Sequence, residues 1–297
     1  MRIGMTGCGF GPTATGELVR CAAQTAETVG FSTLWFGEHA VLFEAEAETL
    51  YPDKDPRHKA RSFLLDPHTA IADPIVAMTW AAAATVRMEI GTSILILPQR
   101  QPVVLAKELA TLDAFSGGRL VLGVGSGWSP QEYRATGADW RNRGHSMDEF
   151  VTVMRKLWYE TPASHHSDHF SFENAYLYPK PVRDIPVIFG GDSAKALARV
   201  ARCGDGWSPV KLDLQEAPSL ITHLHRLTEE AGRDPRALRI IKSLTPRDDP
   251  DDMARFRDAG VTEFKLSCFG DLPANETDLV HVIENLAERF VTTADRL

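Results

Sequence analysis

Short apolar runs alternate with amphipathic segments along the whole chain, and this alternation limits the folds open to it. Continuous apolar runs such as 120–124 indicate strands that are covered on both faces, as in a parallel sheet. Strands are predicted at residues 2–5, 33–36, 89–97, 120–124, 186–189, around 207, 238–243 and 261–266. Helices are predicted at 16–29, from Asp73-Pro74, from Pro102, and at 145–159, 193–202, 216–231, 251–259 and 277–290.

Eight β–α units in 297 residues predict an α/β fold, a single (β/α)8 TIM barrel that spans 1–297 as one domain. An extended loop, 40–72, follows the second strand, and 161–183 forms an inserted loop or hairpin before the fifth strand. The structural rival is an open, doubly wound sheet. No G-x-G-x-x-G pattern follows the first strand, and its absence favours the barrel.

Charge and composition limit the partners and the cellular compartment that can be expected for this protein. The formal net charge of −8 argues against nucleic acid or an anionic membrane as the main partner. No signal peptide or long apolar stretch is recognisable, so a cytoplasmic protein without a membrane span is expected. Four cysteines without metal-site or disulfide spacing, Cys8, Cys21, Cys203 and Cys268, are expected to be reduced thiols.

In a barrel, functional groups gather at the carboxyl ends of the strands. Four predicted strand ends carry glycine or polar residues, and the fold would bring them to one rim. They are Gly37-Glu38-His39, Gly91-Thr92-Ser93-Ile94, Gly125-Ser126-Gly127-Trp128 and Gly190-Gly191-Asp192-Ser193. A small-molecule substrate is therefore the expected partner.

Two of these strand ends have both a functional and a plain interpretation. The 190–193 turn could bind an anion such as phosphate at a helix N-terminus, or be a simple turn in which Asp192 caps the helix. His39 could exchange protons near neutral pH, and the carboxylate of Glu38 beside it could tune the pKa of the imidazole. Taken alone, a histidine that only hydrogen-bonds a loop is the commoner case.

Other residues carry weaker signals. His165, His166 and His169 suggest a metal, but they fall in a polar loop with no second cluster, so a solvated loop without metal is expected. Trp128 and Trp207 could line a pocket or pack in the core, and Lys211 is expected at the surface. Aromatic residues that could line a substrate pocket are Phe43, Tyr51, Phe63 and Tyr133.

A series of ordered motifs runs through both halves of the chain. They are Leu34-Trp35-Phe36-Gly37-Glu38-His39, Asp73-Pro74, Gly91-Thr92, Leu97-Pro98, Ser116-Gly117-Gly118-Arg119, Leu122–Trp128, Glu132-Tyr133, the 190–193 turn and Gly204-Asp205-Gly206-Trp207. Taken together, these motifs resemble the luciferase-like monooxygenase superfamily over nearly the whole chain, and most of all its branch that depends on coenzyme F420.

The resemblance implies a barrel that holds a flavin (FMN) or deazaflavin (F420) ring at its mouth. It implies a non-proline cis peptide at Ser93–Ile94 against the ring and a catalytic role for His39. The residues that it implies for cofactor binding are Thr92, Ser93, Ile94, Ser126, Gly127, Trp128, Gly190, Gly191 and Ser193, the last three for the phosphate. Trp128 replaces an acidic residue of that branch, so neither its proton chemistry nor its sugar-phosphate substrate carries over whole.

The leading hypothesis is hydride transfer between F420 and a small organic substrate, with His39 and Glu38 handling the proton. The alternative is an FMN-dependent monooxygenase that uses reduced flavin and O2 in a pocket shielded from water, for which 40–72 could supply a lid. A hypothesis from another class is a non-catalytic flavin-binding accessory subunit. The family resemblance also suggests a homodimer.

Overall fold

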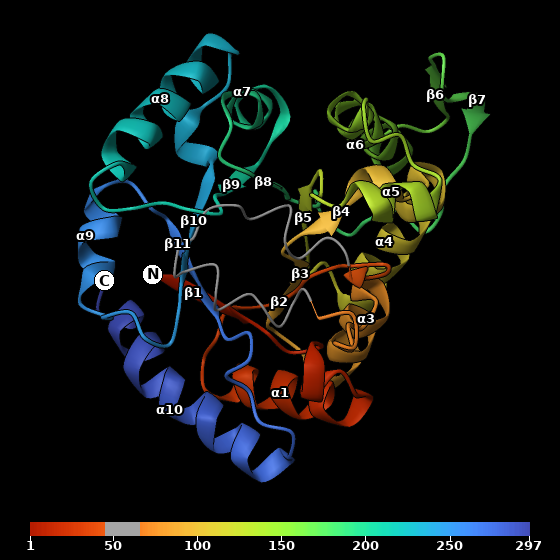
Figure 1. Cartoon of the computed structure of the whole chain (residues 1–297). Helices are drawn as coiled ribbons and strands as arrows, with labels where there is room; N and C mark the ends of the chain where they lie inside the picture. The colour runs from red at the N-terminus through yellow and green to blue at the C-terminus, as the bar shows by residue number, and fades with distance from the viewer. Residues whose placement is uncertain (45–65) are drawn as a thin grey trace.

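The computed structural model describes residues 1–44 and 66–297, and it shows a ring of parallel strands inside a ring of helices (Figure 1). The sheet runs β3-β2-β1-β11-β10-β9-β8-β5-β4, and an additional β3–β5 pairing closes it. Counting β3 and β4 as one interrupted strand, this is the predicted eight-stranded (β/α)8 barrel. The strands are β1 Arg2–Thr6, β2 Thr33–Phe36, β3 Glu89–Thr92, β4 Leu95–Ile96, β5 Leu120–Gly125, β8 Val187–Gly190, β9 Gly206–Ser208, β10 Arg239–Leu244 and β11 Glu263–Ser267.

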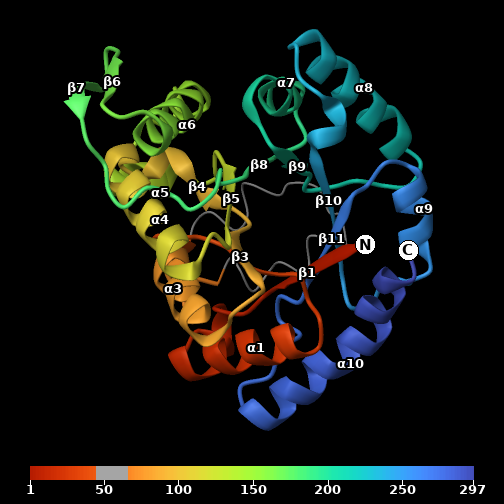
Figure 2. The same cartoon turned by 180° about the vertical axis from the view of Figure 1, so that it is seen from behind.

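The surrounding helices begin and end close to their predicted bounds, and both views show them around the strands (Figure 2). They are α1 Gly16–Thr28, α3 Pro74–Ala84, α4 Pro102–Ser116, α6 Arg143–Tyr159, α7 Ala194–Cys203, α8 Ala217–Glu230, α9 Asp252–Asp258 and α10 Glu276–Asp295. Asp73 caps α3 as expected, because its carboxylate accepts from the backbone N–H groups of Ile75 and Val76. One short helix, α5 Pro130–Thr136, was not predicted.

The third strand differs from the continuous 89–97 that its apolar pattern predicts. It is interrupted at Ser93–Ile94, where the peptide bond is cis, which confirms the expectation for this bond. Glycines on β5 make room for the interruption. A Cβ at Gly123 would lie 1.9 Å from the carbonyl oxygen of Thr92, and one at Gly125 would lie 2.6 Å from Cδ1 of Ile94. Glycine at these two positions of β5 therefore permits the close approach of Thr92 and Ile94.

Two further features shape the barrel. The predicted insertion is an antiparallel hairpin, β6 Ala163–His166 and β7 Ser171–Ala175, which lies outside the helix ring beside α6 (Figure 1). Inside the barrel, the indole of Trp35 is buried against β1 and β3, where a Cβ at Gly4 or Gly91 would approach it within 2.5 and 2.7 Å. Trp35 therefore fills the interior at the level of these two glycines.

An ion-pair network joins the amino ends of several strands. Glu89, at the start of β3, pairs with Arg2, with Arg183 at 2.8 Å and with Arg239 at 3.0 Å, and Arg239 also binds Glu263 at 2.6 Å. Burial alone would raise the pKa of Glu89, but the three guanidinium groups hold it below its ordinary value. The charged form of Glu89 is thus favoured by folding.

We expect Glu89→Gln to lower the free energy of unfolding at pH 7 by about 2–4 kcal/mol, because three arginines lose their shared anion. A carboxyl whose pKa is depressed by folding stabilises the protein above its ordinary pKa, and this contribution disappears as the pH falls through the folded value. The variant should therefore lose less stability than the unmodified protein between pH 6 and about pH 3.

Urea unfolding across this pH range measures the free energy of unfolding of each protein. The matched control is Glu284→Gln, at an exposed position on α10. Equal pH slopes in all three proteins would contradict this account of Glu89.

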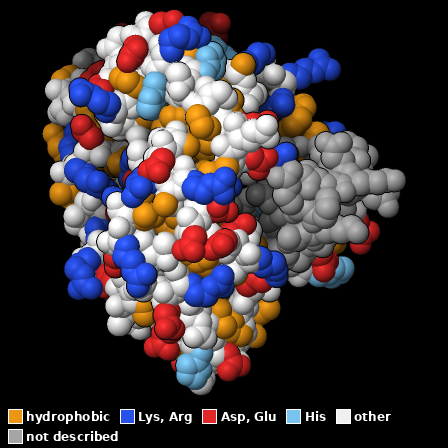
Figure 3. All heavy atoms as spheres, turned by 90° about the vertical axis from the view of Figure 1, so that its left-hand side faces the viewer, with side chains coloured by type: hydrophobic (Ala, Val, Ile, Leu, Met, Phe, Trp, Pro, Cys, Tyr) orange, Lys and Arg blue, Asp and Glu red, His pale blue; other side chains and the backbone are white. Residues whose placement is uncertain are grey.

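The surface shows no dominant sign of charge on the face that α8 and α9 form, where acidic and basic side chains are intermingled (Figure 3). No helix in residues 1–44 or 66–297 combines the length and the apolar character that a bilayer span requires.

Candidate active site

A cavity of about 480 Å³ opens at the carboxyl ends of the strands, which is where a barrel carries its site. Every strand of the barrel, or the turn that follows it, contributes to the lining. One lining residue from each, in chain order, is Phe10, Gly37, Ser93, Gly125, Gly190, Ser208, Ser243 and Lys265. The cavity is therefore assembled from the whole length of the chain.

Most residues that the sequence singled out lie together at this cavity. The predicted residues that line it are Glu38, His39, Ser93, Ile94, Ser126, Gly127, Trp128, Gly190 and Gly191. Thr92 does not, because its side chain is fully buried and its hydroxyl donates to the carbonyl of Gly123 at 2.6 Å. Ser193 lies at the start of α7, where its hydroxyl accepts from the N–H of Ala196 at 3.2 Å.

His39 is held by Glu132, a carboxylate that the sequence analysis names only within a family motif and not as a site residue. Nδ1 of His39 lies 3.2 Å from Oε2 of Glu132, and Oε1 of Glu132 accepts from the N–H of Ala40 at 2.6 Å. The Glu132 side chain is fully buried, and the ring of Trp128 packs edge-on against His39 at 5.2 Å. Because Nδ1 faces Glu132, Nε2 is the ring nitrogen that a molecule in the cavity would meet.

The unpredicted helix α5 explains how Glu132 reaches His39. Ser129 caps α5 by accepting from the N–H of Glu132 at 3.0 Å, and Pro130 occupies the first helical position. Ser129-Pro130-x-Glu132 is the pattern of a capping box, and that signal could have revealed both the helix and the carboxylate. Here the Glu132 side chain turns to His39 and Ala40.

Glu38 has a different partner from the one expected. Its carboxylate accepts from Nε of Arg100 at 2.7 Å and from the N–H of Ile96, and Arg100 also binds Asp73 at 2.7 Å. Successive side chains of an extended segment point to opposite sides, so neighbours in sequence such as Glu38 and His39 separate. Burial raises the pKa of Glu38, against the opposing effect of Arg100. The carboxylate that orients His39 is therefore Glu132, which corrects the expected pairing.

One residue of the cavity lining, Lys265, was also missed by the sequence analysis. Nζ of Lys265, on β11, donates to the hydroxyl of Ser93 and to that of Ser208 at 3.2 Å. Its side chain is almost completely buried and adjoins the interrupted third strand. A charged residue within an apolar strand pattern is itself a signal, because lysine is seldom buried without a purpose.

The 190–193 turn is braced from two sides. Nε1 of Trp207 donates to the carbonyl of Gly191 at 2.8 Å, and the carboxylate of Asp192 accepts from the N–H groups of Val210 at 2.8 Å and Lys211 at 3.0 Å. Trp207 is buried, which agrees with the core-packing interpretation. Lys211 is half exposed, as expected of a surface lysine.

The residues present fit a planar ring with a phosphate-bearing tail. Phe10, Ile94, Trp128 and Phe269 give the cavity apolar walls, and its volume is in the range of small-molecule sites. Gly191 has a φ of +108°, which turns the chain into α7, and backbone N–H groups at a helix N-terminus favour an anion. These features suit FMN and F420 alike.

Of the four suggested aromatic residues, the structure describes two, Tyr133 and Phe43, and neither lines the cavity. Tyr133 is fully buried, and its hydroxyl donates to the carbonyl of Ser126 at 2.6 Å. It therefore holds the Ser126 backbone in place and does not face the cavity. Phe43 is absent from the lining. Tyr51 and Phe63, with most of the suggested 40–72 lid, lie outside the described residues.

Comparisons with known proteins show which family the chain resembles. The family model for luciferase-like monooxygenases matches residues 8–259. An uncharacterized protein of Mycobacterium tuberculosis is 32% identical over 273 residues, covering 91% of this chain and 92% of its own. An F420-dependent glucose-6-phosphate dehydrogenase of Amycolatopsis mediterranei is 29% identical over 67% of this chain and 53% of its own. An FMNH2-dependent dimethylsulfone monooxygenase of Pseudomonas putida is 36% identical over 42% of this chain and 35% of its own.

Solved structures share the fold. An F420-dependent secondary alcohol dehydrogenase in complex with an F420-acetone adduct has a TM-score of 0.75 at 20% identity and covers 99% of both chains. A long-chain alkane monooxygenase has a TM-score of 0.75 at 13% identity, over 97% of this chain and 92% of its own. The same barrel thus occurs in proteins named for two different reactions.

Proposed function

The chain belongs to the luciferase-like monooxygenase family, and from that premise we propose that it transfers hydride between coenzyme F420 and a small organic alcohol or carbonyl compound. One observation carries the proposal. His39, fixed by the buried carboxylate of Glu132, lines the same cavity as the glycine turn at the start of α7. A proton-transfer group and an anion-binding turn thus serve one pocket.

The protein's own residues would bind and orient the reactants. The start of α7 would hold the phosphate, and Ile94, Trp128 and Phe269 would enclose the ring and exclude water. The bound deazaflavin would supply the hydride acceptor or donor. Lys265, in the cavity lining, would favour the negative charge that a transferred hydride adds to the cofactor. Rate would then depend on placement of the reactants.

His39 would move the proton. With Nδ1–H donated to Glu132, Nε2 accepts a proton from a substrate hydroxyl as the hydride leaves its carbon, and returns it to a carbonyl oxygen in the reverse direction. Glu132 stabilises the imidazolium that forms and keeps the ring oriented. Glu38 acts at a distance, through its bond to Arg100, by fixing the segment that carries His39.

The second candidate is an FMN-dependent monooxygenase. The relative from Pseudomonas putida that is named for FMNH2 favours it, and the apolar walls would serve it equally well. We do not propose the sugar-phosphate substrate for which the Amycolatopsis relative is named. Trp128 occupies the position at which the resemblance to that branch leads us to expect an acidic residue.

Titration of the purified protein with F420 and, separately, with FMN in both redox states tests the proposal. We expect saturable binding of one F420 per chain, which is measured by the change in F420 fluorescence. FMN should bind more weakly. Tight binding of FMN and none of F420 would favour the monooxygenase instead. Absence of binding by either compound would refute both candidates.

We also propose a cytoplasmic homodimer. The four cysteines are unpaired, and burial raises the pKa of Cys8 to about 12, as suits an unreactive thiol in a reducing compartment. Neighbouring helices α3 and α4 expose large apolar side chains at Val76, Trp80, Val104 and Phe115, a surface that a second copy could cover. Light scattering would measure the mass, and a monomer at micromolar concentration would contradict the dimer.

A further inference from the structure

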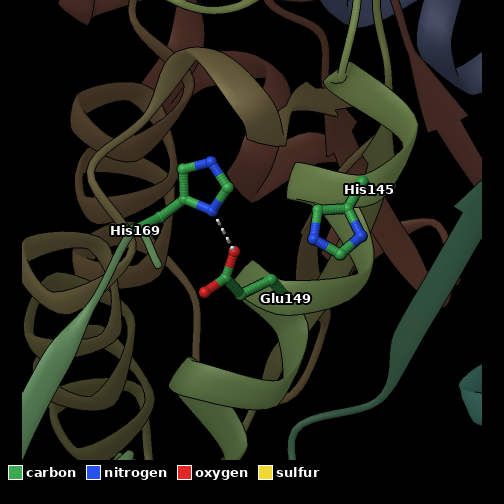
Figure 4. A group of neighbouring side chains, drawn as sticks. All are labelled: His145, Glu149 and His169. Carbon is green, nitrogen blue, oxygen red and sulfur yellow. Dashed lines mark ion pairs between the residues drawn. The ribbon is translucent and has the colours of Figure 1, made fainter. Parts of the chain in front are cut away.

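A group of metal-ligating side chains lies outside the cavity, where α6 meets the β6–β7 hairpin. His145 and Glu149 are four residues apart on α6 and therefore share one face of the helix. His169 comes from the turn between β6 and β7, and the three side chains face one space (Figure 4). None of the three lines the cavity at the barrel mouth.

The ligand atoms of this group are close enough to share an ion. One ligand atom from each residue lies within 4.8 Å of the others, and Nδ1 of His169 is 3.2 Å from Oε2 of Glu149. Tetrahedral zinc, with bonds of about 2.0–2.1 Å, places neighbouring ligand atoms about 3.3 Å apart. The His169–Glu149 spacing matches that geometry, and a ring nitrogen of the exposed His145 lies within 4.8 Å of both ligand atoms.

Glu149 is the central observation, because one of its oxygens is buried without a hydrogen bond. Its side chain is only 8% exposed, and within residues 1–44 and 66–297 no group donates a hydrogen bond to Oε2. Oε1, by contrast, accepts from the hydroxyl of Ser167 and lies 3.4 Å from Nε2 of His165. These two partners orient the carboxylate so that Oε2 faces His169.

The charge state of Glu149 suits a ligand. A glutamate side chain is ordinarily anionic at neutral pH, and this one lies 3.4 Å from Nε2 of His165 and 3.2 Å from Nδ1 of His169. A buried carboxylate oxygen that accepts no hydrogen bond and has only the ring of His169 at 3.2 Å is costly unless a cation completes its surroundings.

We propose that His145, Glu149 and His169 bind one divalent transition-metal ion, zinc by preference, with water in the fourth position. Two imidazole nitrogens and one carboxylate oxygen are ligands typical of zinc, whereas Mg²⁺ and Ca²⁺ take oxygen ligands. The sequence did not indicate this site, because His165, His166 and His169 show no second cluster until α6 brings His145 and Glu149 beside them. Of those three histidines, His169 is the ligand and His165 orients Glu149.

The ion would fasten the hairpin to α6. The hairpin otherwise lies outside the ring of helices, and metal binding that requires the folded arrangement adds its free energy to folding. The site is independent of the proposed oxidoreductase function, since it shares no residue with the cavity.

Calorimetric titration of the chelator-treated full chain with ZnCl2 tests the site. We expect one equivalent to bind, and we expect His145→Ala and His169→Ala to weaken zinc binding at least 100-fold, with Glu149→Gln doing the same. His166→Ala is the matched control. This histidine is in the same hairpin and 59% exposed, but it contacts Ser171 and Glu173 instead of the cluster. It should bind zinc as the unmodified protein does.

The melting temperature supplies a second measurement. Zinc should raise it for the unmodified protein and for His166→Ala, but not for the ligand variants. The exposed positions 145 and 169 keep the test valid if Glu149→Gln fails to fold. Lack of one-equivalent zinc binding, or unchanged affinity in both histidine variants, would overturn the proposal. F420 titration of the same variants should stay unchanged, so a failure here is separable from a failure of the proposed function.

Discussion

His39→Ala is expected to lower the turnover of F420-linked oxidation or reduction by about 10²- to 10⁴-fold, the usual contribution of a positioned acid–base group. Affinity for the cofactor should change little, because the 190–193 turn that would hold the phosphate does not involve His39. Steady-state rates are measured with whichever alcohol or ketone the unmodified protein converts, and cofactor affinity is measured by fluorescence titration.

Glu132→Gln is expected to have a smaller effect on turnover than His39→Ala. A neutral amide still occupies the space and can still bond to Ala40, but it stabilises an imidazolium less well, so turnover should fall by about 10- to 10³-fold. His68→Ala, at an exposed histidine paired with Asp66, is the control and should be fully active. Full activity of His39→Ala would remove the proton role and would agree with a chain in which this site is not catalytic.

Gly191→Val is expected to weaken cofactor binding by about 10- to 100-fold. At a φ of +108° a β-branched residue is strained by about 1–3 kcal/mol, so the turn must change shape. Space is not the obstacle, since a Cβ there would lie 3.4 Å from that of Ala196, an ordinary contact. The effect should therefore appear in the dissociation constants of F420 and FMN.

The control for this variant is Gly232→Val in the turn after α8. Gly232 also has a positive φ, of +75°, and nothing lies within 4 Å of a Cβ placed there. It should lose stability to a similar extent in urea unfolding but bind cofactor normally. If both variants bind as the unmodified protein does, the turn at 190–193 does not hold the cofactor.

The fold was predictable because its information is local and periodic. Strands buried on both faces, such as 120–124, give apolar runs, and helices such as the one from Pro74 carry their own start signals. Helix α5 was not predicted because its seven residues are too few to show a helical period of apolar residues. The interruption at Ser93–Ile94 is invisible to hydrophobicity, and only the family resemblance indicated it.

The candidate site was predictable only where strand ends carry it. His39 and the glycines at 190–191 lie directly after strands, so topology alone brings them to one rim. Local signals could mark Glu132 and Lys265, but the partners of Glu132, Arg100 and Lys265 could not be assigned, because they lie far away in sequence and are chosen by packing. The same reason made Glu38 seem the partner of His39, since adjacency in sequence is not adjacency of side chains.

A crystal structure of the protein with F420 tests the central claim most directly. We predict the deazaflavin ring in the cavity, against Ile94, with its phosphate at the start of α7 and Nε2 of His39 facing the reacting side of the ring. A ring bound elsewhere on the molecule, or one that leaves His39 and the 190–193 turn without contact, would contradict it.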